Sequence, residues 1–208
     1  MSGGLDSATV LAIAKSRFSK IFVLTFDYGQ RHYREIASAK RIASCQKVDL
    51  HKVLKIDLRA FGASALTSKI AVPKKRNSQQ ISSGIPVTYV PARNTVFLSL
   101  ALAWAEVLDA KAIFIGVNAI DYSGYPDCRR DFIDSMEDSL SLALDSKIKI
   151  HTPLMYLTKA ETWKMAKDLD CLEVIIHQTH TDYNGNRTDF NEWGYGALDN
   201  RASQLRAK

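Results

Sequence analysis

The feature that most constrains this chain is a short glycine-containing loop at its beginning, Ser2-Gly3-Gly4-Leu5-Asp6-Ser7. Two adjacent glycines let a backbone approach a bulky anion closely and adopt positive φ without a Cβ clash. Apolar residues then recur at helix-like spacing, at Leu11, Ile13, Ala14 and Phe18. The loop therefore opens a helix, and the free N–H groups and positive dipole end of a helix N-terminus suit a phosphate.

Asp6 adds a second requirement to this loop. A carboxylate repels a phosphate unless a cation lies between them, so the loop with Asp6 predicts a phosphate together with magnesium. The alternative is that the first residues of the chain bind no ligand and that an aspartate or a serine only caps the helix. Phosphate loops normally leave the end of a β-strand. Because this sequence begins in the loop, either upstream residues are missing from it or the natural start is shortened.

Size, charge and cysteine usage restrict the class of protein. A chain of 208 residues with 46% hydrophobic residues forms one large domain with a sizeable core. We expect a catalytic domain over residues 1–178 and a polar tail over 179–208. The net charge of +6 suits an anionic substrate or a nucleic acid and decides neither. Three scattered cysteines and the lack of a signal peptide or a membrane-length apolar run predict a cytoplasmic protein.

Strand and helix patterns alternate along the chain. Strands are predicted at 21–26, 48–56, 112–117, 147–151 and 173–178, and helices at 8–19, 31–46, 95–109, 130–144 and 158–168. This alternation predicts an α/β fold with a Rossmann-like parallel sheet and right-handed crossovers. Ligands of such sheets bind at the carboxyl ends of the strands. We therefore expect four polar clusters to converge on one rim: 2–7, 27–32, 91–94 and 118–129.

Two of these clusters carry side chains suited to an aromatic, acidic ligand. Arg93 can bind a phosphate or a carboxylate with two parallel hydrogen bonds, although a surface arginine beside a helix-capping Asn94 fits the same spacing. The 118–129 loop combines aromatic rings, which stack on a flat heterocycle, with carboxylates, which accept from its donor edge. A plain turn is the alternative there. The candidate residues of this loop are Asp121, Tyr122, Tyr125, Asp127, Cys128 and Arg129.

Lys159 stands at a predicted helix start, where Thr158 and Glu161 form a capping box. Its ammonium group can neutralise phosphate charge in a transition state, although an exposed lysine without a role fits equally well from the pattern alone. Cys128 beside Arg129 is more plausible as a packed or substrate-contacting thiol than as a nucleophile. The five histidines have no metal-binding spacing.

At this point several stretches carry a family resemblance. Residues 2–7 resemble the PP-loop of the ATP pyrophosphatase superfamily, which has an adenine-nucleotide alpha-hydrolase-like fold. Together with the other matching stretches they resemble the 7-cyano-7-deazaguanine synthase family of the queuosine pathway, over about residues 2–180. Those stretches are Phe26-Asp27-Tyr28-Gly29-Gln30-Arg31-His32, Tyr89 to Thr95, Gly116 to Arg129, His151 to Leu154 and Leu157 to Glu161.

The resemblance implies a reaction and a division of roles. The family converts 7-carboxy-7-deazaguanine, ammonia and ATP into 7-cyano-7-deazaguanine: ATP activates the carboxylate, ammonia forms the amide, and a second activation dehydrates it to the nitrile. Ser2, Gly3, Gly4, Leu5, Asp6 and Ser7 would hold the pyrophosphate of ATP, with Asp6 near magnesium and Lys159 balancing phosphate charge. Arg93, Asn94, Asp121, Tyr122, Tyr125, Asp127 and Arg129 would line the deazaguanine and carboxylate site.

The chain departs from the family in two respects. The family has a strand before the PP-loop, near the centre of the sheet, and without it the neighbouring strands lose hydrogen-bonding partners. The family's tail also binds zinc through four cysteines, and the matching positions here are Asp182, Ala197, Asn200 and Ser203. No thiolate remains at any of them, so we predict that no zinc binds and that the tail is either rebuilt or loosely held.

The family resemblance leaves two other functions open. One is a PP-loop protein that adenylates a tRNA base, which the +6 charge and the basic 74–80 segment permit, although a missing Cys-x-x-Cys weakens a thiolation role. The other is a non-catalytic homologue, which the absent strand and cysteines favour. For the leading hypothesis we expect small-molecule substrates, no membrane, no direct nucleic-acid binding and a possible homodimer.

Overall fold

Helices and parallel strands alternate along the chain, which confirms the predicted α/β class. The computed structural model describes residues 1–30, 33–62, 64, 67, 85–86, 88–120, 124–144, 147–180, 188–197 and 201–207. Its first elements are α1 (Leu5–Arg17), β1 (Phe22–Asp27), α2 (Arg34–Cys45), β2 (Leu50–Lys55) and the 3-10 helix η1 (Leu58–Phe61). The later ones are α4 (Arg93–Val107), β3 (Ala112–Phe114), the 3-10 helix η2 (Pro126–Cys128), α5 (Arg130–Ala143), β4 (Lys149–His151), α6 (Lys159–Asp168), α7 (Leu172–Gln178), β5 (Phe190–Asn191), β6 (Gly194–Tyr195) and α8 (Arg201–Arg206).

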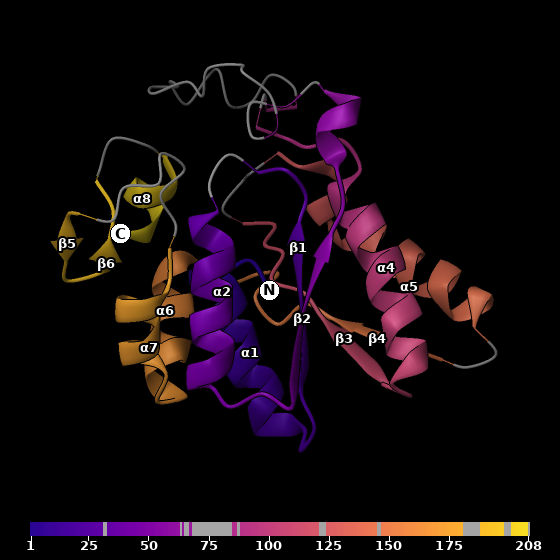
Figure 1. Cartoon of the computed structure of the whole chain (residues 1–208), viewed down its shortest axis with the longest axis horizontal. Helices are drawn as coiled ribbons and strands as arrows, with labels where there is room; N and C mark the ends of the chain where they lie inside the picture. The colour runs from indigo at the N-terminus through magenta and orange to yellow at the C-terminus, as the bar shows by residue number, and fades with distance from the viewer. Residues whose placement is uncertain are drawn as a thin grey trace.

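Two parallel strand pairs form the centre of the molecule. β1 pairs with β2 from Phe22 opposite Leu50 to Asp27 opposite Lys55, and β3 pairs with β4 from Ala112 opposite Lys149 to Phe114 opposite His151. Within the described residues no hydrogen-bonded ladder joins β1 to β3. α1 and α2 lie beside the first pair, and α4 and α5 lie on the other side of the molecule, near the second pair (Figure 1).

Two of the apolar clusters each stabilise one half of the molecule. One joins α1, β1, α2, α6 and α7 through buried side chains such as Leu5, Val23, Ile42 and Ile175. The other joins α4, α5 and β4 through residues that include Leu98, Ile133 and Ile150. Because α1 contributes to one cluster and also packs against β3, the phosphate loop at its start is held between the two halves.

The segment predicted as the last strand is the helix α7, so that prediction was wrong. Val174-Ile175-Ile176 has strand-like composition, but Cys171, Ile175 and Thr179 are the buried positions, four residues apart. Spacing of four places them on one helical face, against the cluster formed by α1 and α6. Packing of that face overrides the local β-propensity. None of the described helices is long and apolar enough to cross a membrane.

The C-terminal segment is attached to α7 by a buried arginine. The Arg206 side chain is 1% exposed, and its guanidinium donates to the Thr179 hydroxyl (2.6 Å), the Ile175 carbonyl (3.2 Å) and the Trp193 carbonyl (2.8 Å). The Trp163 indole donates back to the Arg206 carbonyl (2.9 Å). Burial lowers the pKa of Arg206 to about 10, which still leaves it charged at neutral pH.

We expect Arg206→Met to destabilise the protein. The change removes the hydrogen bonds to the Trp193 carbonyl and to the Thr179 hydroxyl, whereas the Ile175 carbonyl still accepts from Thr179. A buried polar group left unsatisfied costs about 1–3 kcal/mol. The matched control is Arg59→Met, because the Arg59–Asp57 ion pair is more than half exposed on both sides and such surface pairs contribute little to stability. Urea denaturation of both variants measures the difference, and equal losses of unfolding free energy would argue against an anchoring role for Arg206.

Candidate functional site

The phosphate loop is organised by its own hydroxyl groups and leads directly into α1. The Ser7 hydroxyl accepts from the Gly3 N–H (3.1 Å) and donates to the Gly4 carbonyl (3.1 Å). The Ser2 hydroxyl donates to the Ser7 hydroxyl (3.2 Å). α1 begins at Leu5, three residues earlier than the sequence pattern indicates. The backbone N–H groups of the first turn of α1 are therefore placed as anion donors directly after the loop.

Gly3 is the tightest point of the loop. Its φ is +88°, and a Cβ built there would lie 2.4 Å from the Glu35 carbonyl oxygen and 2.8 Å from the Ala39 nitrogen, both in α2. On its other side, the backbone N–H of His180 donates to the Gly3 carbonyl (2.9 Å). The loop is thus pressed against α2 and connected to the segment that Arg206 anchors through Thr179.

The two predicted catalytic side chains meet each other. The Lys159 ammonium lies 2.8 Å from both carboxylate oxygens of Asp6, and the two side chains are 16% and 32% exposed. Lys159 is the first residue of α6, and the predicted capping box between Thr158 and Glu161 is present. Gly116 lies against the same turn, since a Cβ there would be 3.5 Å from the Ser7 nitrogen.

A second group of polar residues surrounds the start of α4. The Asn94 N–H donates to the Asp127 carboxylate (2.9 Å), and the Asn94 side-chain amide donates to the Asp127 carbonyl (3.0 Å). Both residues are buried, and the Asp127 carboxylate therefore caps α4 while fixing the 118–129 loop to it. Ala92, the N-cap residue, has φ +51°, an uncommon conformation that is found at functional sites.

Arg93 lies among aromatic rings in this group. Its guanidinium carbon is 6.0 Å from the ring centres of both Tyr28 and Phe97. Burial acts to lower the pKa of Arg93, but the acidic groups around it, Tyr28, Tyr125, Asp127 and Cys128, together raise the pKa by more. Burial raises the pKa of Tyr28 and of Tyr125, and the positive charge of Arg93 opposes both shifts. All three groups therefore keep their ordinary charge at neutral pH: a fixed cation between two neutral phenols.

The remaining predicted residues are placed less centrally or not described. Arg129 is exposed and donates to the Pro126 carbonyl (3.2 Å), at the N-cap of α5. Four others lie outside the described residues: Asp121 and Tyr122 of the substrate set, and Asp182 and Asn200 of the tail. The basic 74–80 segment also lies outside them. Ala197 and Ser203 are described, and the prediction that no zinc binds there stays a prediction.

Glu35 lies close to the candidate site, and the sequence patterns did not single it out. It lies in the first turn of α2, with its carbonyl against Gly3 and its side chain within electrostatic reach of Tyr28 and Arg93. Burial raises its pKa to about 7, and the positive charge of Arg93 opposes this shift. The available signal was its position in the helix that follows the 27–32 cluster. Glu35 connects the phosphate loop to the residues around Arg93.

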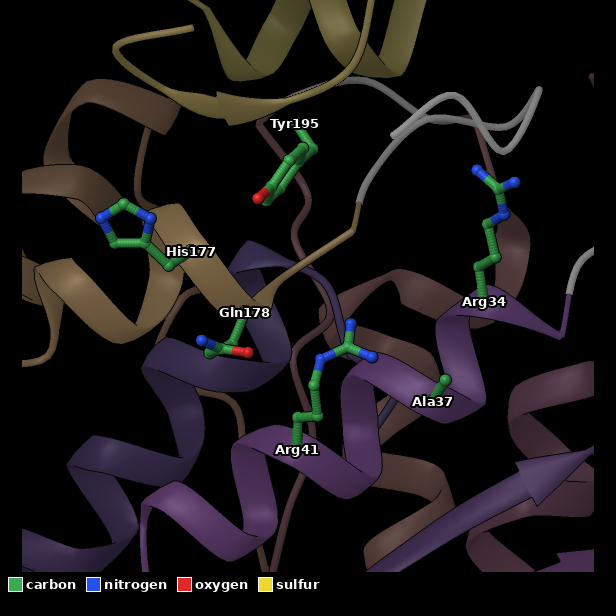
Figure 2. Close-up of a pocket in the computed structure, with 6 residues that line it drawn as sticks. All are labelled: Arg34, Ala37, Arg41, His177, Gln178 and Tyr195. Atoms are coloured by element: carbon green, nitrogen blue, oxygen red, sulfur yellow. The ribbon is translucent and has the colours of Figure 1, made fainter. Parts of the chain in front are cut away.

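Another face of α2 borders a pocket of about 520 Å³. Figure 2 shows Arg34 and Arg41 extending from α2 toward the C-terminal segment, from which Tyr195 points back toward them. His177 and Gln178 complete the wall from α7. The two guanidinium groups make the pocket basic, which contributes positive potential on the side of α2 that faces α7.

Comparison with known proteins identifies the family. A family model described as "Queuosine biosynthesis protein QueC" matches residues 1–207. A 7-cyano-7-deazaguanine synthase from Paramagnetospirillum magneticum is 56% identical over 174 residues, covering 81% of this chain and 77% of that protein. One from Picrophilus torridus is 52% identical over 191 residues, covering 90% and 78%. The chain belongs to the 7-cyano-7-deazaguanine synthase family. The family resemblance of the sequence is confirmed.

A solved structure supports the fold independently. The NMN synthetase from Francisella tularensis superposes with a TM-score of 0.54 over 99% of this chain and 72% of that chain. The sequence identity is 18%, so this likeness concerns the fold alone. It agrees with the parallel α/β arrangement that the strand pairs show.

Proposed function

We propose that this chain converts 7-carboxy-7-deazaguanine, ammonia and ATP into 7-cyano-7-deazaguanine for queuosine biosynthesis. The observation that carries the proposal is the meeting of two groups of residues at α2. On one side of Glu35 lies the phosphate loop, pressed against the helix at Gly3. Arg93 and Tyr28 lie within electrostatic reach of the Glu35 side chain. A nucleotide in the loop and an aromatic acid beside Arg93 would share one reaction centre.

Each group matches one chemical requirement. A carboxylate is a poor electrophile, and its transfer to the α-phosphate of ATP supplies a leaving group. Arg93 would bind the substrate carboxylate, and the ring of Tyr125 would pack on the pyrrolopyrimidine. The loop N–H groups would hold the phosphates, and Lys159 would balance the charge that develops on the departing pyrophosphate. Asn94 and Asp127 would position Arg93 and the 118–129 loop.

Magnesium fits the loop through Asp6. Its carboxylate is about one-third exposed, so it retains lone pairs beyond those that accept from Lys159. Mg²⁺ in nucleotide sites characteristically takes one or two protein carboxylates and completes its shell with phosphate oxygens and water. Asp6 would supply the protein ligand, and the ion would offset phosphate charge. The described residues contain no cluster of three or more His, Cys, Asp or Glu that could hold a metal by themselves.

Product analysis tests the proposal directly. The chain is incubated with ATP, ammonium and 7-carboxy-7-deazaguanine, and mass spectrometry measures the nitrile product in the presence and absence of each substrate. We expect nitrile only in the complete mixture. Isothermal titration then separates the other functions: binding of ATP without the acid indicates base adenylation on tRNA, and binding of neither indicates a non-catalytic homologue.

We expect Asp127→Ala to weaken binding of 7-carboxy-7-deazaguanine by at least about tenfold, which is the usual effect of losing a charged hydrogen bond. ATP binding should be nearly unchanged. The reason is that the Asp127 carboxylate fixes the start of α4, where Arg93 lies, whereas no contact of Asp127 reaches the phosphate loop within the described residues. Asp131→Ala is the control, since that side chain is 77% exposed. Titration of both ligands provides the measurement. Equal losses of affinity would contradict this division of the site.

A further inference from the structure

The pocket between α2, α7 and the C-terminal segment has one basic wall. Arg34, Ala37 and Arg41 are spaced three and four residues apart, so they lie on one face of α2. Both arginines extend from that face toward the C-terminal segment, on either side of Ala37 (Figure 2). Because alanine has only a methyl group, the space between the two arginines belongs to the pocket, whose volume is about 520 Å³. Pockets for small molecules typically have about 300–1,000 Å³.

Within the described part of the chain, no carboxylate lines this pocket. Its lining residues are Arg34, Ala37, Arg41, His177, Gln178 and Tyr195. Glu173, one turn before His177 in α7, lies 3.2 Å from the imidazole, but the Glu173 side chain is 82% exposed. Two positive charges beside a concave space attract anions, and a guanidinium group binds a phosphate through two parallel hydrogen bonds. The attraction is strongest at Arg41, which is half-buried.

An aromatic ring faces the basic wall from the opposite side. Tyr195 points from the C-terminal segment toward α2 (Figure 2). Phe190 packs against Tyr195 with their ring centres 4.9 Å apart, and it stacks on the His177 imidazole with centres 5.2 Å apart and 16° between the planes. The three rings form one packed group, so Tyr195 presents an ordered ring to the pocket. A nucleobase packs favourably on such a ring.

The pocket is distinct from the phosphate loop. Gly3 of the loop approaches the backbone of α2 at Glu35 and Ala39. The three pocket residues of α2 lie on a different face of the helix, because successive residues are rotated by about 100° around its axis. A ligand in the pocket therefore contacts α2 without occupying the loop that we assign to the phosphates of ATP.

We propose that this pocket is a second nucleotide site, which binds phosphate groups between Arg34 and Arg41 and a base against Tyr195. Seven residues separate the two arginines, which places them about 10 Å apart along the helix axis and suits an elongated anion such as a nucleoside diphosphate. The side-chain amide of Gln178 supplies a donor and an acceptor for the sugar or the phosphates. The site goes beyond the proposed function, because it takes no part in the reaction and does not depend on it.

Chemical modification of arginines tests the site in the full chain. Phenylglyoxal is reacted with the protein, and mass spectrometry follows the rates at Arg34 and Arg41, with Arg59 as the reference because its side chain is 58% exposed outside the pocket. The probes are ADP, GDP and inorganic pyrophosphate. At ten times its dissociation constant, a bound nucleotide should slow modification of Arg34 and Arg41 about tenfold, because only about one pocket in eleven is empty. The rate at Arg59 should not change.

Ala37→Met separates binding in the pocket from an indirect effect of nucleotide in the phosphate loop. Methionine fills the space between the two arginines and keeps both charges, so it should abolish their protection. Ala103→Met is the matched control, since Ala103 is exposed on α4, and it should retain the protection. Unchanged modification of the wild type with ADP and with GDP, or protection that persists in Ala37→Met, would overturn the proposal. Equal protection by pyrophosphate would overturn the assignment to a nucleotide.

Discussion

Lys159→Met is expected to lower the rate of acid-dependent pyrophosphate exchange by about 10²–10³-fold, the usual effect of removing one transition-state charge partner. In the present geometry the Lys159 ammonium contacts both oxygens of Asp6, beside the phosphate loop. Without that ammonium, the Asp6 carboxylate loses its contacting side-chain cation, and less positive charge remains beside the phosphates. We therefore expect kcat to fall more than the affinity for the deazaguanine acid.

Lys167→Met provides the matched control for this prediction. Lys167 belongs to the same helix, α6, and is exposed in its last turn. The control variant should exchange pyrophosphate at the wild-type rate. If Lys159→Met also exchanged at that rate, the contact with Asp6 would be a structural ion pair only.

Gly3→Ala is the second change with a large expected effect. The left-handed backbone conformation alone costs an alanine about 1–2 kcal/mol, and forcing a methyl group against the Glu35 carbonyl adds about 1–3 kcal/mol of overpacking. The two closest contacts of the added methyl group are with backbone atoms of α2, which cannot move aside as a flexible side chain can. The loop must therefore shift, and a shift of about 1 Å at a reaction centre lowers a rate by about 10²-fold.

The control for Gly3→Ala isolates the steric contribution. Gly62 also has positive φ, +66°, but a Cβ there meets nothing within 4 Å. Gly62→Ala should lower the unfolding free energy by the backbone cost only and leave the exchange rate unchanged. Denaturation and kinetics of the two variants are compared, and an equally active Gly3→Ala variant would show that the loop tolerates displacement.

Much of the fold follows from local patterns, and its exceptions have physical causes. The capping box at Thr158 and Glu161 located the start of α6 correctly because both partners lie within one helical turn. The strand prediction at 173–178 failed because burial of Ile175 and its neighbours four residues away depends on helices distant in sequence. The attachment of the tail by Arg206 was likewise unpredictable, since its acceptors lie 13 to 31 residues away.

The residues of the candidate site were likewise predictable only in part. Motifs identified Asp6 and Lys159, which meet in the structure although 153 residues separate them. They also identified Asn94 and Asp127, whose hydrogen bonds join α4 to the 118–129 loop. Glu35 was not identified, because its contact with Gly3 and its closeness to Arg93 arise only from tertiary packing. Neither property is visible in a helix sequence that also reads as an ordinary amphipathic surface helix.

The most direct test of a shared reaction centre follows the substrate's carboxylate oxygens. 7-Carboxy-7-deazaguanine labelled with oxygen-18 in its carboxylate is incubated with the chain, ATP and ammonium, and mass spectrometry locates the label. If the phosphate loop and the Arg93 group act on one bound pair of substrates, the label appears in the phosphate of AMP as nitrile accumulates. Nitrile formed without labelled AMP would contradict activation of the acid by the nucleotide at this site.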